Sequence, residues 1–258
     1  MSRLHAELSR LYRPQPSAGQ GVDAAEPGLI GVDARVRAMV LEIAGPAGCA
    51  DIVRLWKAVQ VDLALPAPAI AVSGIDGCQL WFSLVEPLPV VQAREFLEAL
   101  RVRYLRDIAP ERVRLLPTAD TPTPLHAAPV PALQAQTGCW SAFVAPDLAA
   151  MFGDTPWLDI PPGHDGQSDL LSRLESITAA DFRMALERLV AGAAQASAPD
   201  DVTSAGTGQD TAGTLPSCGG ADPKRFLLDV MNNENVALGL RIEAAKALLP
   251  YFDNPRRP

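Results

Sequence analysis

The stretch AIAVSGIDGCQLWFSLVEPLP, residues 69–89, decides the fold of this chain. It holds two segments rich in β-branched and aromatic residues, 69–73 and 78–84, joined by a short link that contains Gly and Asp. Such a link between two extended segments is typical of a β-hairpin. Two prolines close the second segment, and an apolar stripe at helical spacing follows over 90–105. The sequence therefore predicts a strand, a turn, a second strand and a helix, in this order.

Helical and extended segments lie on both sides of this hairpin. Residues 33–44 are apolar and fit either a helix or a strand, whereas residues 48–60 carry a helical apolar stripe. The tripeptide Val61-Asp62-Leu63 is the end of that helix or the start of a short edge strand. Further along, the pattern predicts two strands and two helices, at 112–117, 136–144, 168–176 and 178–190. This mixture predicts an α+β fold, in which helices flank a mixed sheet.

Composition divides the chain into four parts. Residues 1–31 hold a short amphipathic helix and a Gly- and Pro-rich stretch, which predicts a helix on a flexible linker. Residues 32–191 form the main domain. Residues 192–221 have almost no large apolar side chain and cannot offset the entropy of ordering, so they are predicted to be a disordered linker. Residues 222–254 begin with Asp-Pro, a helix-start signal, and predict a helical hairpin.

The overall charge limits the partners of the protein. Its 258 residues carry a formal net charge of −8. This argues against indiscriminate binding to polyanions, because nucleic-acid affinity begins with neutralisation of phosphates. Arginine nevertheless outnumbers lysine nineteen to three. A basic patch remains open, and its candidate nucleic-acid-binding residues are Arg101, Arg103, Arg106, Arg112 and Arg114, with Trp81 as a base-stacking candidate. A solvated, salt-bridged helix face explains the same arginines about as well.

Hydropathy and cysteine usage predict the cellular setting. No apolar run reaches the roughly 18–20 residues needed to cross a bilayer, and the first residues lack the apolar core of a secretion signal. The four cysteines lie far apart with no paired spacing. We therefore expect reduced thiols in the core or in loops rather than a disulfide or a metal site. Together these features predict a cytoplasmic protein without a membrane partner.

The hairpin motif is similar to a region of a known superfamily. The residues that carry the similarity are Ser73, Gly74, Gly77, Gln79 and Trp81, followed by a Glu-Pro turn and a helix. This order resembles the second motif region of the archaeo-eukaryotic primase superfamily, Ser-Gly-x-x-Gly-x-His-x-Trp, with Gln79 at the histidine position. A later stretch, 131–144, contains Thr-Gly and a strand ending in Phe-Val, and extends the resemblance to residues 45–190.

The resemblance implies a sheet of the RNA-recognition type that cradles template and nucleotide. Nucleotidyl transfer in this superfamily uses two metal ions, held by an Asp-x-Asp pair and a third acid. Here Asp62 is followed by Ala64 at the second aspartate position, Asp120 is the nearest third acid, and Gln79 carries no charge. The resemblance therefore implies residual catalytic positions at Asp62, Gln79 and Asp120, no metal site and no cofactor. Mg²⁺ or Mn²⁺ would be needed only by an active enzyme.

The tail has a resemblance of its own. Its segments DPKRFLLDVMN and LRIEAAKALLPY, within residues 222–251, are similar to a segment of phage small terminase subunits. This implies a helical hairpin that binds a protein partner or DNA. We therefore predict a non-polymerising, primase-like protein of a mobile element or prophage, which associates with single-stranded or primer-template DNA in replication or packaging. A scaffold protein without nucleic-acid binding and an active DNA primase-polymerase with displaced acids remain alternatives.

Overall fold

A computed structural model describes residues 2–14, 29–31, 33–118 and 127–196. They belong to the first of two compact units of the chain, Met1–Asp201. The predicted hairpin at 222–254, almost all of the predicted linker at 192–221, and Asp120 lie outside the described residues. The description below concerns the first unit alone.

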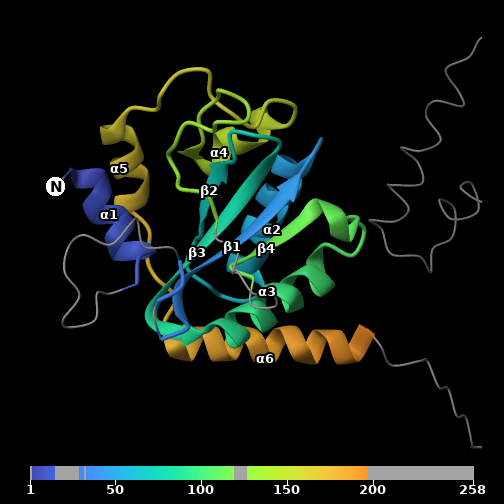
Figure 1. Ribbon diagram of the computed structural model, residues 1–258. Coiled ribbons are helices and arrows are strands. Elements are labelled where there is room, and N and C mark those ends of the chain that lie inside the picture. Colours follow the sequence, from blue (N-terminus) through green and yellow to red (C-terminus); the bar gives the residue numbers. More distant parts are fainter. Residues whose placement is uncertain (1, 15–28, 32, 119–126, 197–258) are drawn as a thin grey trace, which may run out of the picture. The chain divides into compact units, whose positions relative to one another are not determined.

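Five strands form one antiparallel sheet (Figure 1). The strands are β1 (Arg35–Ala44), β2 (Ala69–Val72), β3 (Gly77–Pro89), β4 (Val113–Leu116) and β5 (Ala142–Val144). Their order across the sheet is β4-β1-β3-β2-β5. The apolar stretch that fits a helix or a strand is therefore β1, the second strand from the β4 edge. The α+β class predicted from the sequence is confirmed.

Helices connect the strands in a split βαβ arrangement. Helix α2 (Gly48–Val61) joins β1 to β2, the hairpin joins β2 to β3, and α3 (Val90–Tyr104) joins β3 to β4. With β3 inserted between β1 and β2, the order 4-1-3-2 is that of ferredoxin-like and RNA-recognition-type sheets. A short helical turn, η1 (Pro110–Arg112), precedes β4. The central strands of this sheet, β1 and β3, position the candidate site.

One face of the sheet packs on α2, α3 and α6 (Ala179–Ala196) and is entirely apolar in its centre. Every second residue of β1 and β3 points into it, including Leu41, Ile43, Leu80 and Phe82. Phe96 of α3 lies edge-on to Phe82, with ring centroids 5.8 Å apart. This is the main hydrophobic core. Helix α6 runs to Ala196, five residues past the predicted domain boundary at 191.

The opposite face is covered by two short helices, α1 (Arg3–Leu11) and α5 (His164–Ser172). Small residues of the sheet, among them Ala38, Ala69 and Ala71, leave room for Tyr12 at the end of α1. The Arg10 guanidinium donates to the carbonyls of Leu171 and Leu174, 3.0 and 3.2 Å away, which ties α1 to the end of α5. The predicted N-terminal helix thus docks on the sheet in this structure.

Strand β3 continues through the two prolines that were predicted to end it. After a β-bulge, Leu88 and Pro89 pair with Val36 and Arg35 of β1. The Arg35 guanidinium donates to the Pro87 carbonyl at 2.6 Å, so a proline serves here as an acceptor and needs no N–H. The prediction that these prolines end the strand is wrong because β1 supplies a long partner strand.

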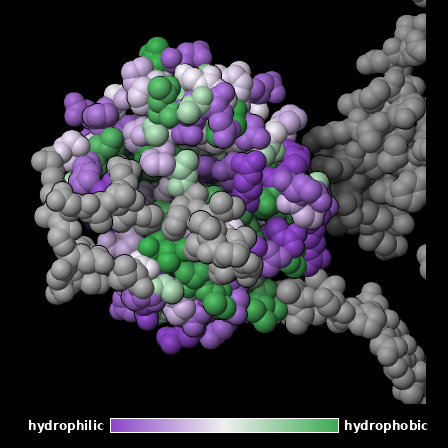
Figure 2. Space-filling view, viewed as in Figure 1, coloured by the Kyte–Doolittle hydropathy of each residue, from purple (hydrophilic) through white to green (hydrophobic). Residues whose placement is uncertain are grey.

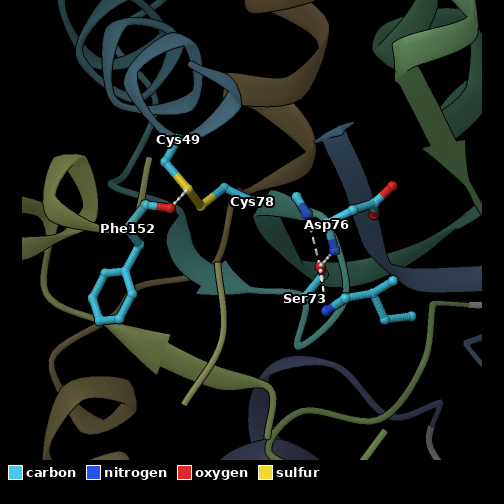
Figure 3. The surroundings of a disulfide bond; sticks show 7 residues. Cys49, Ser73, Asp76, Cys78 and Phe152 are labelled. Carbon is cyan, nitrogen blue, oxygen red and sulfur yellow. Dashed lines mark hydrogen bonds between the residues drawn. A yellow bond between two sulfur atoms is a disulfide. The ribbon is translucent and has the colours of Figure 1, made fainter. Parts of the chain in front are cut away.

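A disulfide bond joins Cys49 of α2 to Cys78 of β3, with the two Cα atoms 5.0 Å apart (Figure 3). The prediction of reduced thiols is therefore wrong for this pair. The two residues are separated by 29 positions and meet only because the first turn of α2 packs on β3. Such a separation carries no recognisable disulfide pattern. Cys139 has a free thiol.

The surface that encloses these layers is mixed. Figure 2 shows hydrophilic and hydrophobic groups interspersed on the face in view. Two further short elements, α4 (Pro146–Ala149) and η2 (Ala150–Phe152), lie beside α2 and carry exposed apolar side chains at Leu148 and Met151. Among the described helices, none has the length and apolar character required to span a bilayer.

Candidate functional site

A row of side chains crosses the sheet on the face beneath α1 and α5. The strand register sets Arg114 of β4 opposite Glu42 of β1, and Glu42 opposite Gln79 of β3. Gln79 in turn lies opposite Ala71 of β2, which pairs with Phe143 of β5. Cross-strand partners share a face, so these five side chains form one row. The row is polar on the β4 side of Gln79 and apolar on the β5 side.

The polar half of this row is a buried, hydrogen-bonded network. One Glu42 oxygen accepts a hydrogen bond from Gln79 Nε2 at 2.8 Å, and the other pairs with the Arg114 guanidinium at 2.9 Å. The Trp81 indole N–H donates to Gln79 Oε1 at 2.9 Å. The Glu42 side chain is 6% exposed and that of Arg114 is 52% exposed. A carboxylate held in the sheet is thus neutralised by an arginine that reaches the surface. We name this the Glu42–Gln79–Arg114 network.

The chemistry open to this network differs from that of a two-metal site. A two-metal site needs several carboxylates around one point. The network offers a single carboxylate whose two oxygens already accept hydrogen bonds. Within the described ranges, no group of three His, Cys, Asp or Glu side chains is placed to hold a metal ion. Gln79 uses both ends of its amide inside the protein, and an amide does not titrate as an acid or a base.

The Ser-Gly-x-x-Gly motif forms the turn that places Gln79. Ser73 Oγ accepts hydrogen bonds from the backbone N–H groups of Ile75, Asp76 and Gly77, at 3.1, 3.2 and 3.0 Å (Figure 3). Gly74 has a φ of +77°, which L side chains rarely adopt. A Cβ on Gly77 would lie 2.6 Å from the Ile43 carbonyl oxygen of β1. The serine and the glycines of the motif therefore have clear structural roles.

The second stretch of the sequence resemblance contacts this turn. The Thr137 hydroxyl donates to the Gly74 carbonyl at 2.6 Å. Nearby, Ser141 Oγ lies 3.3 Å from the Gln134 side-chain nitrogen, and both residues are buried. The two motif regions, 73–81 and 131–144, are therefore adjacent in space, although the residues that join them are 63 positions apart in sequence.

Asp62 lies at the end of α2, not on a strand. Its carboxylate accepts a hydrogen bond from the Tyr104 hydroxyl at 3.1 Å, and the residue is exposed. The pKa of Tyr104 is raised to about 12, mainly by burial and to a smaller extent by this hydrogen bond. Of the two alternatives for residues 61–63, the end of the helix is confirmed and the edge strand is wrong, because the helix continues through Val61. The predicted positions Asp62 and Gln79 have separate hydrogen-bond partners.

The five predicted arginines occupy two places. Arg101, Arg103 and Arg106 lie on the last turns of α3 and just after it, whereas Arg112 and Arg114 lie at β4. Arg101 donates to the Glu98 carboxylate, which lowers the pKa of Glu98. The remaining donors bond to main-chain carbonyls or to Glu42: Arg103 to Arg188, Arg106 to Val102, Arg112 to Ala44 and Pro46, and Arg114 to Glu42.

Trp81 is enclosed by other aromatic rings. Its ring meets Tyr12 and Phe143 edge-on, at centroid distances of 5.1 and 5.8 Å, and it is buried. The structure therefore leaves no face of Trp81 open to a stacked base, contrary to the sequence prediction. The reason is α1, whose end brings Tyr12 over the tryptophan.

Two residues were missed by sequence reasoning. Glu42 lies in a strand that is apolar on both faces, so no alternation marked it as a sheet residue facing Gln79. The sequence signal that could have identified Glu42 is that it is an isolated acid within the apolar run of β1. Arg188 of α6 joins Arg103 through its carbonyl although 85 positions separate them. No sequence signal joins residues at such a distance.

No protein-family model matches this chain, and no curated protein matches its sequence.

Proposed function

We propose that this is a nucleic-acid-associated protein of a mobile element or prophage, with a primase-polymerase-like sheet that does not polymerise. It acts in the cytoplasm, in DNA replication or packaging, with single-stranded or primer-template DNA as its partner. The observation that carries the proposal is the Glu42–Gln79–Arg114 network, which spans β3, β1 and the edge strand β4 of a split βαβ sheet. In the superfamily resemblance, Gln79 stands at the position of a histidine.

The binding surface in this proposal lies outside the covered sheet face. Helices α1 and α5 occupy that face, and Trp81 is buried beneath them. Arg103, Arg106 and Arg188 lie around the end of α3 and on α6, and each donates to a main-chain carbonyl. We name these three residues the α3–α6 arginine group. Guanidinium groups on a helix surface bind phosphates without reading sequence.

Removal of the negative charge of Asp62, which lies beside the arginine group, is expected to change phosphate binding in the opposite direction to removal of an arginine. The main-chain oxygen of Asp62 accepts from Arg188 at 3.4 Å, and its carboxylate accepts from Tyr104, so a negative charge lies beside the arginine group. If the surface binds phosphates, removal of this charge by Asp62→Asn strengthens binding. If Asp62 is a metal ligand of an active enzyme, the same substitution abolishes primer synthesis with Mn²⁺ or Mg²⁺.

The test is fluorescence anisotropy of a labelled single-stranded oligonucleotide with the full chain at low salt. We expect the Arg103→Ala/Arg106→Ala/Arg188→Ala variant to bind at least tenfold more weakly. The matched control removes three exposed cations elsewhere: Arg54, Lys57 and Arg173. Equal losses in the two variants would show only a general effect of charge. Thermal unfolding of both variants checks that the fold is kept.

A scaffold role is the second candidate, and one observation favours it. Each arginine of the α3–α6 group already donates to a protein acceptor, as expected for side chains that cap helix ends and join helices. A scaffold protein predicts no oligonucleotide binding even at low salt. Its partner would bind the tail at 222–254, which lies outside the described residues.

A further inference from the structure

The Cys49–Cys78 pair lies where three chain segments approach one another at the backbone. A Cβ on Gly48 would lie 2.5 Å from the Ile43 carbonyl oxygen, and one on Gly77 would lie 2.6 Å from the same atom. The start of α2, the end of β1 and the start of β3 are therefore in close contact. The disulfide joins the first and the last of these segments, and both cysteines are fully buried.

The start of α2 lacks a side-chain cap. Its N-cap residue, Ala47, has a φ of 65° and makes no side-chain capping hydrogen bond. A non-glycine residue in this conformation is strained, and a missing cap leaves N–H groups of the first turn without a side-chain acceptor. The covalent bond therefore restrains a helix start that its own sequence stabilises poorly.

We propose that Cys49 and Cys78 form a redox-responsive site, which dithiol reductants open and disulfide oxidants close. The closed state fixes the first turn of α2 on β3, and the open state releases it. This proposal does not depend on nucleic-acid binding. In a reducing compartment the pair is open at rest, and exposure to oxidant closes it.

The pair opens by thiol–disulfide exchange, in which the dithiol reductant supplies the electrons and protons. One thiolate of the dithiol attacks a sulfur of the pair, forms a mixed disulfide and releases the other cysteine, which takes up a proton. The second thiol of the reductant then displaces the remaining cysteine and closes its own disulfide. Two electrons and two protons pass from the dithiol to the protein. Closing the pair reverses these steps with a disulfide such as oxidised glutathione as the acceptor.

Two neighbours determine how the site is reached and what it influences. The Phe152 carbonyl oxygen lies 3.3 Å from Cys49 Sγ, so η2 covers the bond on the side of α2 (Figure 3). Met151 in the same short element is 76% exposed, which places η2 at the surface. The bond therefore lies beneath a surface element, and this is the side from which a reductant would approach. Cys78 directly precedes Gln79 on β3, so the bond lies beside the residue at the centre of the network.

The first measurement needs no variant. The full chain is treated with oxidised glutathione, denatured and alkylated without reductant, and then analysed as peptides by mass spectrometry. We expect a cross-linked peptide pair containing Cys49 and Cys78, and alkylated Cys139. Alkylation of Cys49 and Cys78 in the oxidised sample would overturn the proposal.

The second measurement compares melting temperatures with and without dithiothreitol. For a loop of this size, the wild type is expected to melt roughly 10 °C lower when reduced. Cys49→Ser should melt near the reduced wild type and show no response to dithiothreitol. The matched control, Cys139→Ser, should keep the full response. An unchanged melting temperature of the wild type would overturn the proposal, and if Cys49→Ser fails to fold the peptide measurement decides.

Discussion

The two faces of the sheet are built on different principles. The face under α2, α3 and α6 is apolar in its centre and joins Phe82 to Phe96 in one cluster. The face under α1 and α5 combines an aromatic group around Trp81 with the Glu42–Gln79–Arg114 network. Burial of apolar area is sufficient to explain the first face. The second face keeps a charge where burial of a hydrocarbon would cost less free energy, so apolar burial alone does not explain it.

The largest effect is expected on the apolar face. Phe96 is fully buried and contacts two other aromatic rings, so Phe96→Ala leaves a cavity and should lower the free energy of unfolding by about 4 kcal/mol. Val91 is on the same helix and is 61% exposed, so Val91→Ala should change it by less than about 0.5 kcal/mol. Urea unfolding measures both. Similar small losses would mean that this face is not the core.

A second test concerns Gly77, where the start of β3 closely approaches the end of β1. The added methyl group in Gly77→Ala meets main-chain atoms of Ile43 and Ala44, which cannot move without shifting β1. We expect a loss of about 2–3 kcal/mol, the upper range for overpacking. Gly166 has open space around it and lies in α5, so Gly166→Ala is the control and should be neutral or slightly stabilising. Equal urea midpoints for Gly77→Ala and Gly166→Ala would refute the close approach of Gly77 to β1.

The network itself is tested by a double-mutant cycle. Arg114→Ala leaves the buried Glu42 carboxylate with one partner and should cost about 1–2 kcal/mol, because Arg114 is half exposed. When Glu42→Gln is already present, the same change should cost much less. Arg54→Ala breaks a surface pair and serves as the control, with an expected loss below about 0.5 kcal/mol. Additive losses in the cycle would mean that the two residues do not interact.

The smallest effect is a pH dependence at the end of α2. Because the pKa of Tyr104 is raised to about 12 from its ordinary 10.0, the folded state holds this proton more tightly than the unfolded chain does. Its contribution to stability is fully present below pH 10 and is lost as the pH rises through 12. Tyr104→Phe should therefore flatten the decline in urea midpoint over this window. An identical decline in both proteins would contradict the raised pKa, which burial and, second, the Asp62 hydrogen bond produce.

Local patterns predicted the elements of the fold but not its register. The hairpin at 69–84 and the helices around it follow from β-branched residues, turn residues and helical spacing, and the structure contains them. The pairing of Glu42 with Gln79 depends on which strand lies beside β3, and this is settled by packing of α2 and α3. The Cys49–Cys78 bond arises in the same way. Long-range contacts of this kind leave no periodic trace in one sequence.

At the candidate site too, local motifs were predictable from the sequence and long-range contacts were not. Gln79 was found because it stands in a local motif, and the structure places it at the centre of the network. The resemblance predicts a catalytic position at Asp62, but this residue lies at a helix end and accepts a hydrogen bond from Tyr104. Trp81 has the composition of a stacking residue, but α1 covers it. Composition indicates which side chains are able to act, whereas only the tertiary fold determines which are accessible.

The most direct test of nucleic-acid association is the salt dependence of oligonucleotide binding by the full chain. Three phosphate contacts from the α3–α6 arginine group predict that a plot of log K against log salt concentration has a slope of roughly −2. The account predicts measurable binding at low salt that falls with this slope. Binding that is absent at low salt, or that does not change as salt is added, would contradict it.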